Sequence, residues 1–220
     1  SQTMSLDLSA LEKQNNLRYP ADANPKLTAE GRRLRNKYND AQSIINAVLR
    51  NFREEAYYYT LQPPLLTNNS LDQFYFETRS GFCEYYASSF TYLMRAAGIP
   101  ARVVLGYMGG ELNPNGGYYS IYQRDAHAWA EVRLKGSGWQ RIDPTAAVSP
   151  ERVESGFSQS LLNEQSSLSE SLFSARTFEN FALLNNLRLQ FQALDYQWTQ
   201  WVVGYSAQKQ KNFLSQWLGN

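Results

Sequence analysis

Nine residues of strict alternation, 126–134, constrain this chain more than any other feature of its sequence. Alanine, valine or leucine occupies every second position of the run, from Ala126 to Leu134. The positions between them hold His127, Trp129, Glu131 and Arg133. Because successive side chains of a β-strand point to opposite faces, the run predicts a strand with one apolar face. The glycines at 136 and 138 predict a turn, and residues 139–143 predict an antiparallel strand that returns.

A helix is expected to begin at or just after Cys83, the only cysteine of the chain. Apolar side chains recur at helical spacing from Tyr86 to Ala97, Gly98 stands where a C-terminal cap belongs, and a proline follows two residues later. The β-branched segment 101–107 then predicts a short buried strand. A helix packed on antiparallel strands indicates an α+β fold.

An N-terminal helical region is predicted ahead of this core. Thr28 is the expected N-cap of a helix through Tyr38, and Asp40 is the expected N-cap of a second helix that ends near Glu55. The remaining elements are expected to be strands at 57–61 and 118–122 and a long glycine-rich loop at 109–117.

Four parts are expected along the 220 residues. Residues 1–27 are polar and form an N-terminal arm, and residues 28–148 form the core. The serine-rich residues 149–176 form a linker. Apolar residues from Leu184 to Tyr205 recur at alternating steps of three and four, which predicts a long amphipathic helix within 177–217.

Composition excludes several function classes. The chain has 21 Lys and Arg against 20 Asp and Glu, so its formal charge of +1 makes nucleic acid a poor main partner. One cysteine and one histidine exclude an internal disulfide and a Cys- or His-rich zinc site, and we expect no metal or organic cofactor. No run of about 18 apolar residues is present. The opening segment lacks the features of a signal peptide, so a soluble globular piece is expected.

Cys83, His127 and Asp143 are the residues that could carry chemistry. A thiol at a helix N-terminus lies at the positive end of the helix dipole, which favours the nucleophilic thiolate. His127 could hold and return the proton, and Asp143 on the returning strand could orient the imidazole. Each residue also has an ordinary structural interpretation: a small buried hydrophobe, a strand histidine and a turn former. Their order along the predicted elements favours the catalytic interpretation.

The strand register tests this hypothesis. If Arg133 lies opposite Trp139, then His127 and Asp143 share a face one diagonal step apart, roughly 7 Å between Cβ atoms. A tighter turn at residues 136–138 would place Asp143 opposite Glu131, about 13 Å beyond His127. The hypothesis therefore predicts the first register.

Three motifs carry a family resemblance. They are GFCEYYASSFTYLMRAAGIPARVVLGY at 81–107, DAHAWAEV at 125–132 and GWQRIDPT at 138–145. In this order they resemble the transglutaminase-like superfamily. The segments YTLQPPLL at 59–66, GGELNPNGGYY at 109–119 and WTQWVVGY at 198–205 resemble the extramembrane domain of bacterial membrane-anchored members.

The resemblance implies a papain-like transglutaminase core with an N-terminal helical region and a long C-terminal helix. It implies that Cys83 forms a thioester with a protein glutamine, that His127 transfers protons and that Asp143 holds His127. Tyr59 is implied as an oxyanion donor beside the backbone N–H of Cys83. Trp129 shares the face of His127 and is expected either to form a wall of the site or to pack across the strands beside Asp143.

The resemblance also implies a monomeric periplasmic domain of a bacterial inner-membrane protein, anchored by segments outside this sequence. Its partners would be a glutamine-bearing acyl donor and an amine acceptor. Two alternatives stay open: a cysteine peptidase or amidase that uses the same triad, and a catalytically idle module that binds peptide or cell-wall material.

Overall fold

The computed structural model describes residues 8–150, 189, 190, 192–194 and 196. Contacts within the chain divide these residues into two compact units. The larger unit contains residues 8–108 and 123–150, and the smaller contains residues 109–122 together with the described residues from 189 onward. The larger unit has the predicted mixture of helices and antiparallel sheet.

Helices make up the first half of the larger unit. They are α1 (Ala10–Leu17), α2 (Pro25–Lys37), α3 (Ala41–Glu54), the short α4 (Ser70–Asp72) with the π-helix η1 (Gln73–Thr78), and α5 (Cys83–Ala96). Asp40 caps α3 as predicted, because its side chain accepts a hydrogen bond from the Ser43 backbone N–H. The predicted start of α5 at Cys83 is also confirmed.

The sheet of the larger unit has three antiparallel strands in the order β3-β6-β7. These strands are β3 (Ala101–Tyr107), β6 (Ala126–Leu134) and β7 (Gly138–Ile142). Arg133 pairs with Trp139, which is the register that the catalytic hypothesis required. Two shorter strands, β1 (Tyr58–Tyr59) and β2 (Ser80–Gly81), form a separate parallel pair.

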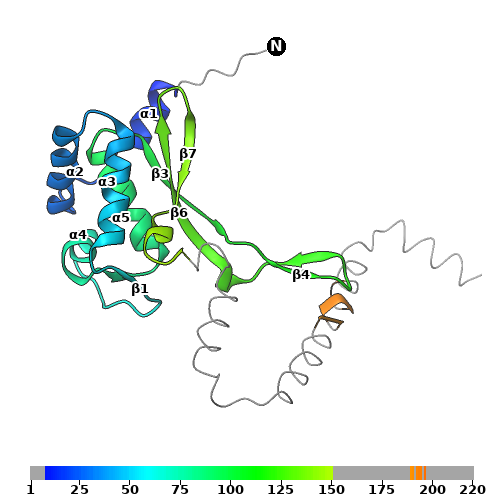
Figure 1. Ribbon diagram of the computed structural model, residues 1–220. Helices are drawn as coiled ribbons and strands as arrows, with labels where there is room; N and C mark the ends of the chain where they lie inside the picture. The colour runs from blue at the N-terminus through cyan, green and yellow to red at the C-terminus, as the bar shows by residue number, and fades with distance from the viewer. Residues whose placement is uncertain (1–7, 151–188, 191, 195, 197–220) are drawn as a thin grey trace, which may run out of the picture. The chain divides into compact units, whose positions relative to one another are not determined.

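The core lies between the helices and the sheet. Figure 1 shows α2, α3 and α5 on one side of β3, β6 and β7, and α5 contacts both β6 and α2. The buried face of β6 presents Ala128, Ala130 and Val132 to this core, as the alternation predicts. The largest fully buried side chains are those of Phe52, Phe74, Tyr86 and Phe90.

The N-terminal elements correct two expectations. Helix α2 begins at Pro25, so Thr28 is not its N-cap; the Thr28 hydroxyl is buried 2.9 Å from the Tyr92 hydroxyl. Part of the predicted arm is the helix α1, whose N-cap Ser9 forms a reciprocal capping box with Glu12.

Strand β3 corrects a third expectation. It is not buried, because it is the edge strand of its sheet and only Ala101 is inaccessible, while Leu105 is 76% exposed. β-branched residues suit an edge strand as well as a central one, so composition alone did not distinguish them.

The smaller unit contains a β-hairpin inside the segment predicted as a loop. Strand β4 (Glu111–Asn113) pairs with β5 (Tyr118–Ser120), which is shorter than predicted. The fully buried Asn113 accepts hydrogen bonds from two backbone N–H groups of the turn and donates one to the Leu189 carbonyl at 2.8 Å. Residues 189, 190, 192–194 and 196 are helical, whereas the remainder of the predicted linker and C-terminal helix lies outside the described residues.

Candidate active site

Cys83 is the first residue of α5, directly after the extended residue Phe82. The first four N–H groups of a helix have no partner within the helix, so the positive end of its dipole faces this thiol. The cysteine is free and half-buried. Its position therefore combines access with an environment that favours a negative charge on sulfur.

His127 and Asp143 meet beyond the end of β7. The Nε2 atom of His127 lies 2.7 Å from Asp143 Oδ2, and their side chains are 3% and 10% exposed. Because a carboxylate only accepts hydrogen bonds, this contact fixes a proton on Nε2 and leaves Nδ1 for another partner. The predicted juxtaposition of these two residues is confirmed by the geometry, although their catalytic roles stay a prediction.

The thiol of Cys83 interacts with three groups. It shares a hydrogen bond with the His127 side chain, and it accepts hydrogen bonds from the Ala128 backbone N–H and the Tyr59 hydroxyl. All three contacts stabilise a thiolate. The structure thus brings together Cys83, His127, Asp143 and Tyr59, four of the five residues proposed for the site.

The pKa values of Cys83 and His127 follow from these contacts. Burial by itself raises the pKa of the Cys83 thiol, but the hydrogen bonds from His127, Ala128 and Tyr59 and the nearby imidazolium charge leave the pKa below its ordinary value. Burial by itself lowers the pKa of His127, but Asp143 and Cys83 raise it to about 9. At neutral pH the favoured state is therefore a thiolate beside an imidazolium.

Asp143 is held by the backbone that follows it. Its Oδ1 accepts a hydrogen bond of 3.2 Å from the Thr145 N–H, which makes Asp143 the N-cap of the 3₁₀-helix η3 (Pro144–Ala147). One oxygen thus binds the backbone while the other binds His127. The turn-former interpretation and the orienting interpretation of Asp143 hold together.

A cleft of about 590 Å³ opens beside the thiol. Its lining comes from β1 and the residues just after it, the start of α5, the end of β3, the 3₁₀-helix η2 (Gln123–Asp125) and the start of β6. The side chains that border it are Tyr59, Leu61, Phe82, Glu84, Leu105, Tyr107, Gln123 and Arg124, besides Cys83 and His127. A substrate segment could reach the sulfur through this opening.

Trp129, the fifth predicted residue, does not line the cleft. Its indole lies beside the imidazole of His127, with ring centroids 6.3 Å apart and planes inclined by 22°. Arg141 lies over Trp129 and 3.6 Å from Asp143 Oδ2. Strand alternation places 141 and 143 on one face, and that pattern could have indicated the contact.

Sequence reasoning missed three further contributors, namely the Ala128 N–H, Leu105 and Tyr107. The Ala128 N–H gives no sequence signal, because every residue except proline has one. Leu105 and Tyr107 belong to the strand predicted as buried, so their place on the cleft was not expected. Among the residues that the structure describes, no group of three His, Cys, Asp or Glu side chains is placed to hold a metal ion.

Comparison with known proteins places this geometry in context. Residues 26–144 match the family model described as the transglutaminase-like superfamily. A protein-glutamine gamma-glutamyltransferase of Pseudomonas aeruginosa is 42% identical over 204 residues, which cover 93% of this chain and 30% of the relative. The uncharacterised protein YebA of Bacillus subtilis is 44% identical over 79 residues, 34% of this chain and 11% of its own length.

A solved structure is similar as well. The periplasmic domain of TgpA from Pseudomonas aeruginosa superposes with a TM-score of 0.67 at 44% identity, covering 70% of this chain and 54% of that domain. Its ethylmercury-bound form superposes with a TM-score of 0.66 at the same identity, over 68% of this chain and 54% of that chain. The chain spans less than a third of the length of the curated glutamyltransferase that it matches.

Proposed function

Because the chain belongs to the transglutaminase-like superfamily, we propose that it is a thiol acyltransferase, namely a protein-glutamine γ-glutamyltransferase with Cys83 as nucleophile. The observation that carries the proposal is the 2.7 Å contact between His127 Nε2 and Asp143 Oδ2, with the other side of the same imidazole bonded to the thiol at the start of α5. A buried structural histidine also needs hydrogen-bond partners, but it does not need to lie between a carboxylate and a thiol at the start of a helix.

The first half-reaction acylates the enzyme. The Cys83 thiolate attacks the carboxamide carbon of a substrate glutamine and forms a tetrahedral intermediate. His127 donates its proton to the departing nitrogen, so the C–N bond breaks, ammonia leaves and a thioester remains.

The second half-reaction transfers the acyl group. Neutral His127 accepts a proton from an incoming amine, whose nitrogen attacks the thioester carbon. The C–S bond breaks, an isopeptide bond forms and the thiolate beside the imidazolium is restored. Asp143 stabilises the imidazolium and keeps the proton on Nε2 throughout.

The developing oxyanion needs hydrogen-bond donors. The backbone N–H of Cys83 lies in the first turn of α5, where helix geometry leaves it without an intrahelical partner. The Tyr59 hydroxyl, which bonds the sulfur at rest, lies beside the atom to which the acyl group attaches and is the proposed second donor.

The cellular location and the partners are inferred from the relatives. The chain is related to a periplasmic domain of a bacterial protein and is assigned to that compartment. No helix among the described residues is long and apolar enough to cross a bilayer. We propose a monomeric domain in which residues 28–148 carry catalysis, with a glutamine side chain of a protein as donor and a primary amine as acceptor.

The test is amine incorporation by the full chain. Dansylcadaverine and dimethylcasein serve as amine and glutamine probes, and covalent fluorescence on the casein is measured beside ammonia release. We expect incorporation by the wild type and its loss in Cys83→Ala and His127→Ala. Ser88→Ala, a change on α5 outside the cleft lining, is the matched control and should retain activity.

Other outcomes separate the alternatives. Ammonia release without fluorescence on casein would identify an amidase that uses the same thioester with water. Wild-type activity equal to that of Cys83→Ala in both assays would contradict the enzymatic proposal and favour a binding module.

A further inference from the structure

Two arginine–tryptophan stacks lie on the sheet face that carries His127. The guanidinium of Arg141 lies 4.3 Å from the ring centre of Trp129, and that of Arg102 lies 4.2 Å from the ring centre of Trp139. Each arginine also faces a carboxylate: Arg102 is 2.6 Å from Glu131, and Arg141 is 3.6 Å from Asp143. The two stacks are chemically alike, but only the Arg141–Trp129 stack adjoins the candidate active site.

Trp129 is held in place by packing alone. Its Nε1 is buried and has no hydrogen-bond partner among the described residues. The ring contacts that remain are the near-parallel stack with His127 and the guanidinium of Arg141. An indole without a hydrogen bond keeps one orientation only if its neighbours close off the others.

Gly106 provides the space that the indole occupies. It pairs with His127 across β3 and β6, and a Cβ atom at this position would lie 2.6 Å from Trp129 Cη2 and 2.9 Å from Cζ3. Gly106 is not one of the glycines with positive φ, so its backbone conformation does not require glycine. The close approach of the Trp129 indole to β3 is what requires a glycine at position 106.

Arg141 connects this indole to the carboxylate of the site. Its guanidinium covers Trp129, and its Nη2 faces the same Asp143 oxygen that binds His127 Nε2. His127 is thus bounded by the carboxylate at its ring nitrogen and by the indole along its side. The arginine contacts both of these neighbours.

We propose that Arg141 and Trp129 are positioning residues that keep the imidazole of His127 and the carboxylate of Asp143 aligned with Cys83. This inference rests on the proposed function, because it assigns the two residues a part in the same relay. It also explains why a glycine stands at 106, where any side chain would displace the indole.

Position rather than charge is the main contribution expected of Arg141. Its side chain is 53% exposed, so solvent screens its effect on Asp143. Glu84 and Arg124 are the charged side chains that border the cleft besides Cys83 and His127, and none of the proposed substitutions changes them. A misplacement of about 1 Å in a catalytic group costs on the order of a hundredfold in rate.

The experiment compares the two stacks in the full chain. Arg141→Gln, Trp129→Leu and Gly106→Ala disturb the stack at the site, whereas Arg102→Gln and Trp139→Leu disturb the control stack. The rate of Cys83 alkylation by iodoacetamide is measured from pH 5 to 10, beside kcat and KM for dansylcadaverine incorporation. Near-ultraviolet circular dichroism and thermal unfolding monitor the fold of each variant.

We expect the three site variants to lower the alkylation rate at pH 7 by roughly tenfold to a hundredfold and to lower kcat more than they raise KM. Their alkylation profile should move toward that of an ordinary thiol. Arg141→Lys and Trp129→Phe should recover part of the loss. The control variants should change alkylation by less than about twofold, even where they lower the unfolding temperature.

Equal losses in the site and control stacks, or an unchanged alkylation profile in the site variants, would overturn the inference while leaving the proposed function intact. A wild-type thiol no more reactive than that of His127→Ala would overturn both. Should one site variant unfold, the conservative replacements Arg141→Lys and Trp129→Phe still separate positioning from simple stability.

Discussion

At the scale of single residues, Asp143 determines how the imidazole titrates. Asp143→Asn keeps the size of the side chain but removes the charge that raises the pKa of His127. We expect amine incorporation to fall roughly 10²- to 10⁴-fold. The alkaline limit of amine incorporation, which requires the imidazolium as proton donor, should move from about 9 toward the ordinary histidine value. Alkylation and incorporation measured against pH test both statements.

The control for this variant is Glu131→Gln, because Glu131 forms an ion pair on the same sheet with Arg102. It should leave the pH profile unchanged. An unaltered alkaline limit in Asp143→Asn would show that Asp143 does not support the imidazolium.

A substitution of Tyr59 tests the proposed oxyanion donor. Tyr59→Phe removes one proposed oxyanion donor but leaves the His127–Asp143 contact in place. The value of kcat should fall roughly 10²-fold with little change in KM, since the donor acts mainly in the transition state. Alkylation of Cys83, which forms no oxyanion, should change far less. Tyr58→Phe, on the same strand but exposed, is the control, and equal kcat values for the two variants would remove Tyr59 from the oxyanion site.

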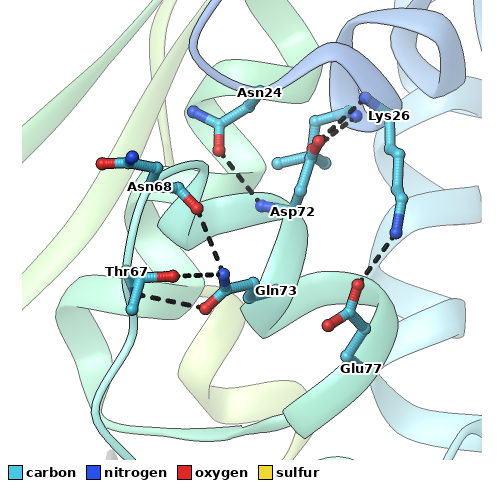
Figure 2. A network of polar contacts seen from close by, with 8 residues as sticks. Asn24, Lys26, Thr67, Asn68, Asp72, Gln73 and Glu77 are labelled. Carbon is cyan, nitrogen blue, oxygen red and sulfur yellow. Dashed lines mark hydrogen bonds and ion pairs between the residues drawn. The ribbon is translucent and has the colours of Figure 1, made fainter.

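At the scale of elements, the N-terminus of α2 is capped from a distant part of the chain. Asp72 is 3% exposed, and its two oxygens accept hydrogen bonds from the backbone N–H groups of Lys26 at 2.9 Å and Leu27 at 2.8 Å. Asn24 returns the contact by accepting from the Asp72 N–H at 3.1 Å. Figure 2 shows these contacts beside the bonds of Gln73 to Thr67 and Asn68.

Asp72→Ala should therefore destabilise the helical region. It removes a charged acceptor from two donors, which should lower the free energy of unfolding by about 2–4 kcal/mol, as measured by urea denaturation. Glu77→Gln breaks only the exposed 2.8 Å ion pair with Lys26 and should cost less than about 1 kcal/mol. Equal costs for the two variants would mean that Asp72 does not act as the cap.

Elements that local sequence features specify could be predicted, whereas elements that depend on distant residues could not. Helix α3 and strand β6 were predicted because a local cap and a strict alternation specify them within a few residues. The start of α2 was not, although Asn24 and Pro25 are residue types typical of a helix start, and the acceptor for its first N–H groups lies 46 residues away. The two-residue strand β2 was not either, since it exists only through its pairing with β1, and β1 is shorter than the strand predicted at 57–61.

At the scale of the whole molecule, more of the candidate site than of its surroundings could be predicted from the sequence. The order of Cys83, His127 and Asp143 along the predicted elements, together with one strand register, was enough to bring these residues together. Arg141 and Trp129 depend on how side chains pack above the sheet, and the hairpin within 109–122 forms one unit with the described residues from 189 onward. Contacts of this kind become visible only in the folded chain.

The ion pair also has a consequence for global stability. Near neutral pH, Cys83 and His127 together bind one proton. In the folded protein this proton is on His127, whereas in the unfolded chain it is on the cysteine thiol. With the Cys83 pKa lowered and the His127 pKa near 9, folded and unfolded wild type bind equal numbers of protons through this pair above the ordinary histidine value. The pair therefore contributes almost no pH dependence to unfolding between about pH 7 and 8.5.

Cys83→Ala removes this compensation. His127 still has a raised pKa from Asp143, so the folded variant binds more protons than the unfolded variant above pH 6.5, and its stability should fall as the pH rises toward the folded pKa. The slope relative to wild type should approach about 1.4 kcal/mol per pH unit. Urea unfolding of both proteins at pH 6.5, 7.5 and 8.5 measures this difference, and parallel stability curves would show that the thiolate and imidazolium do not form a pair.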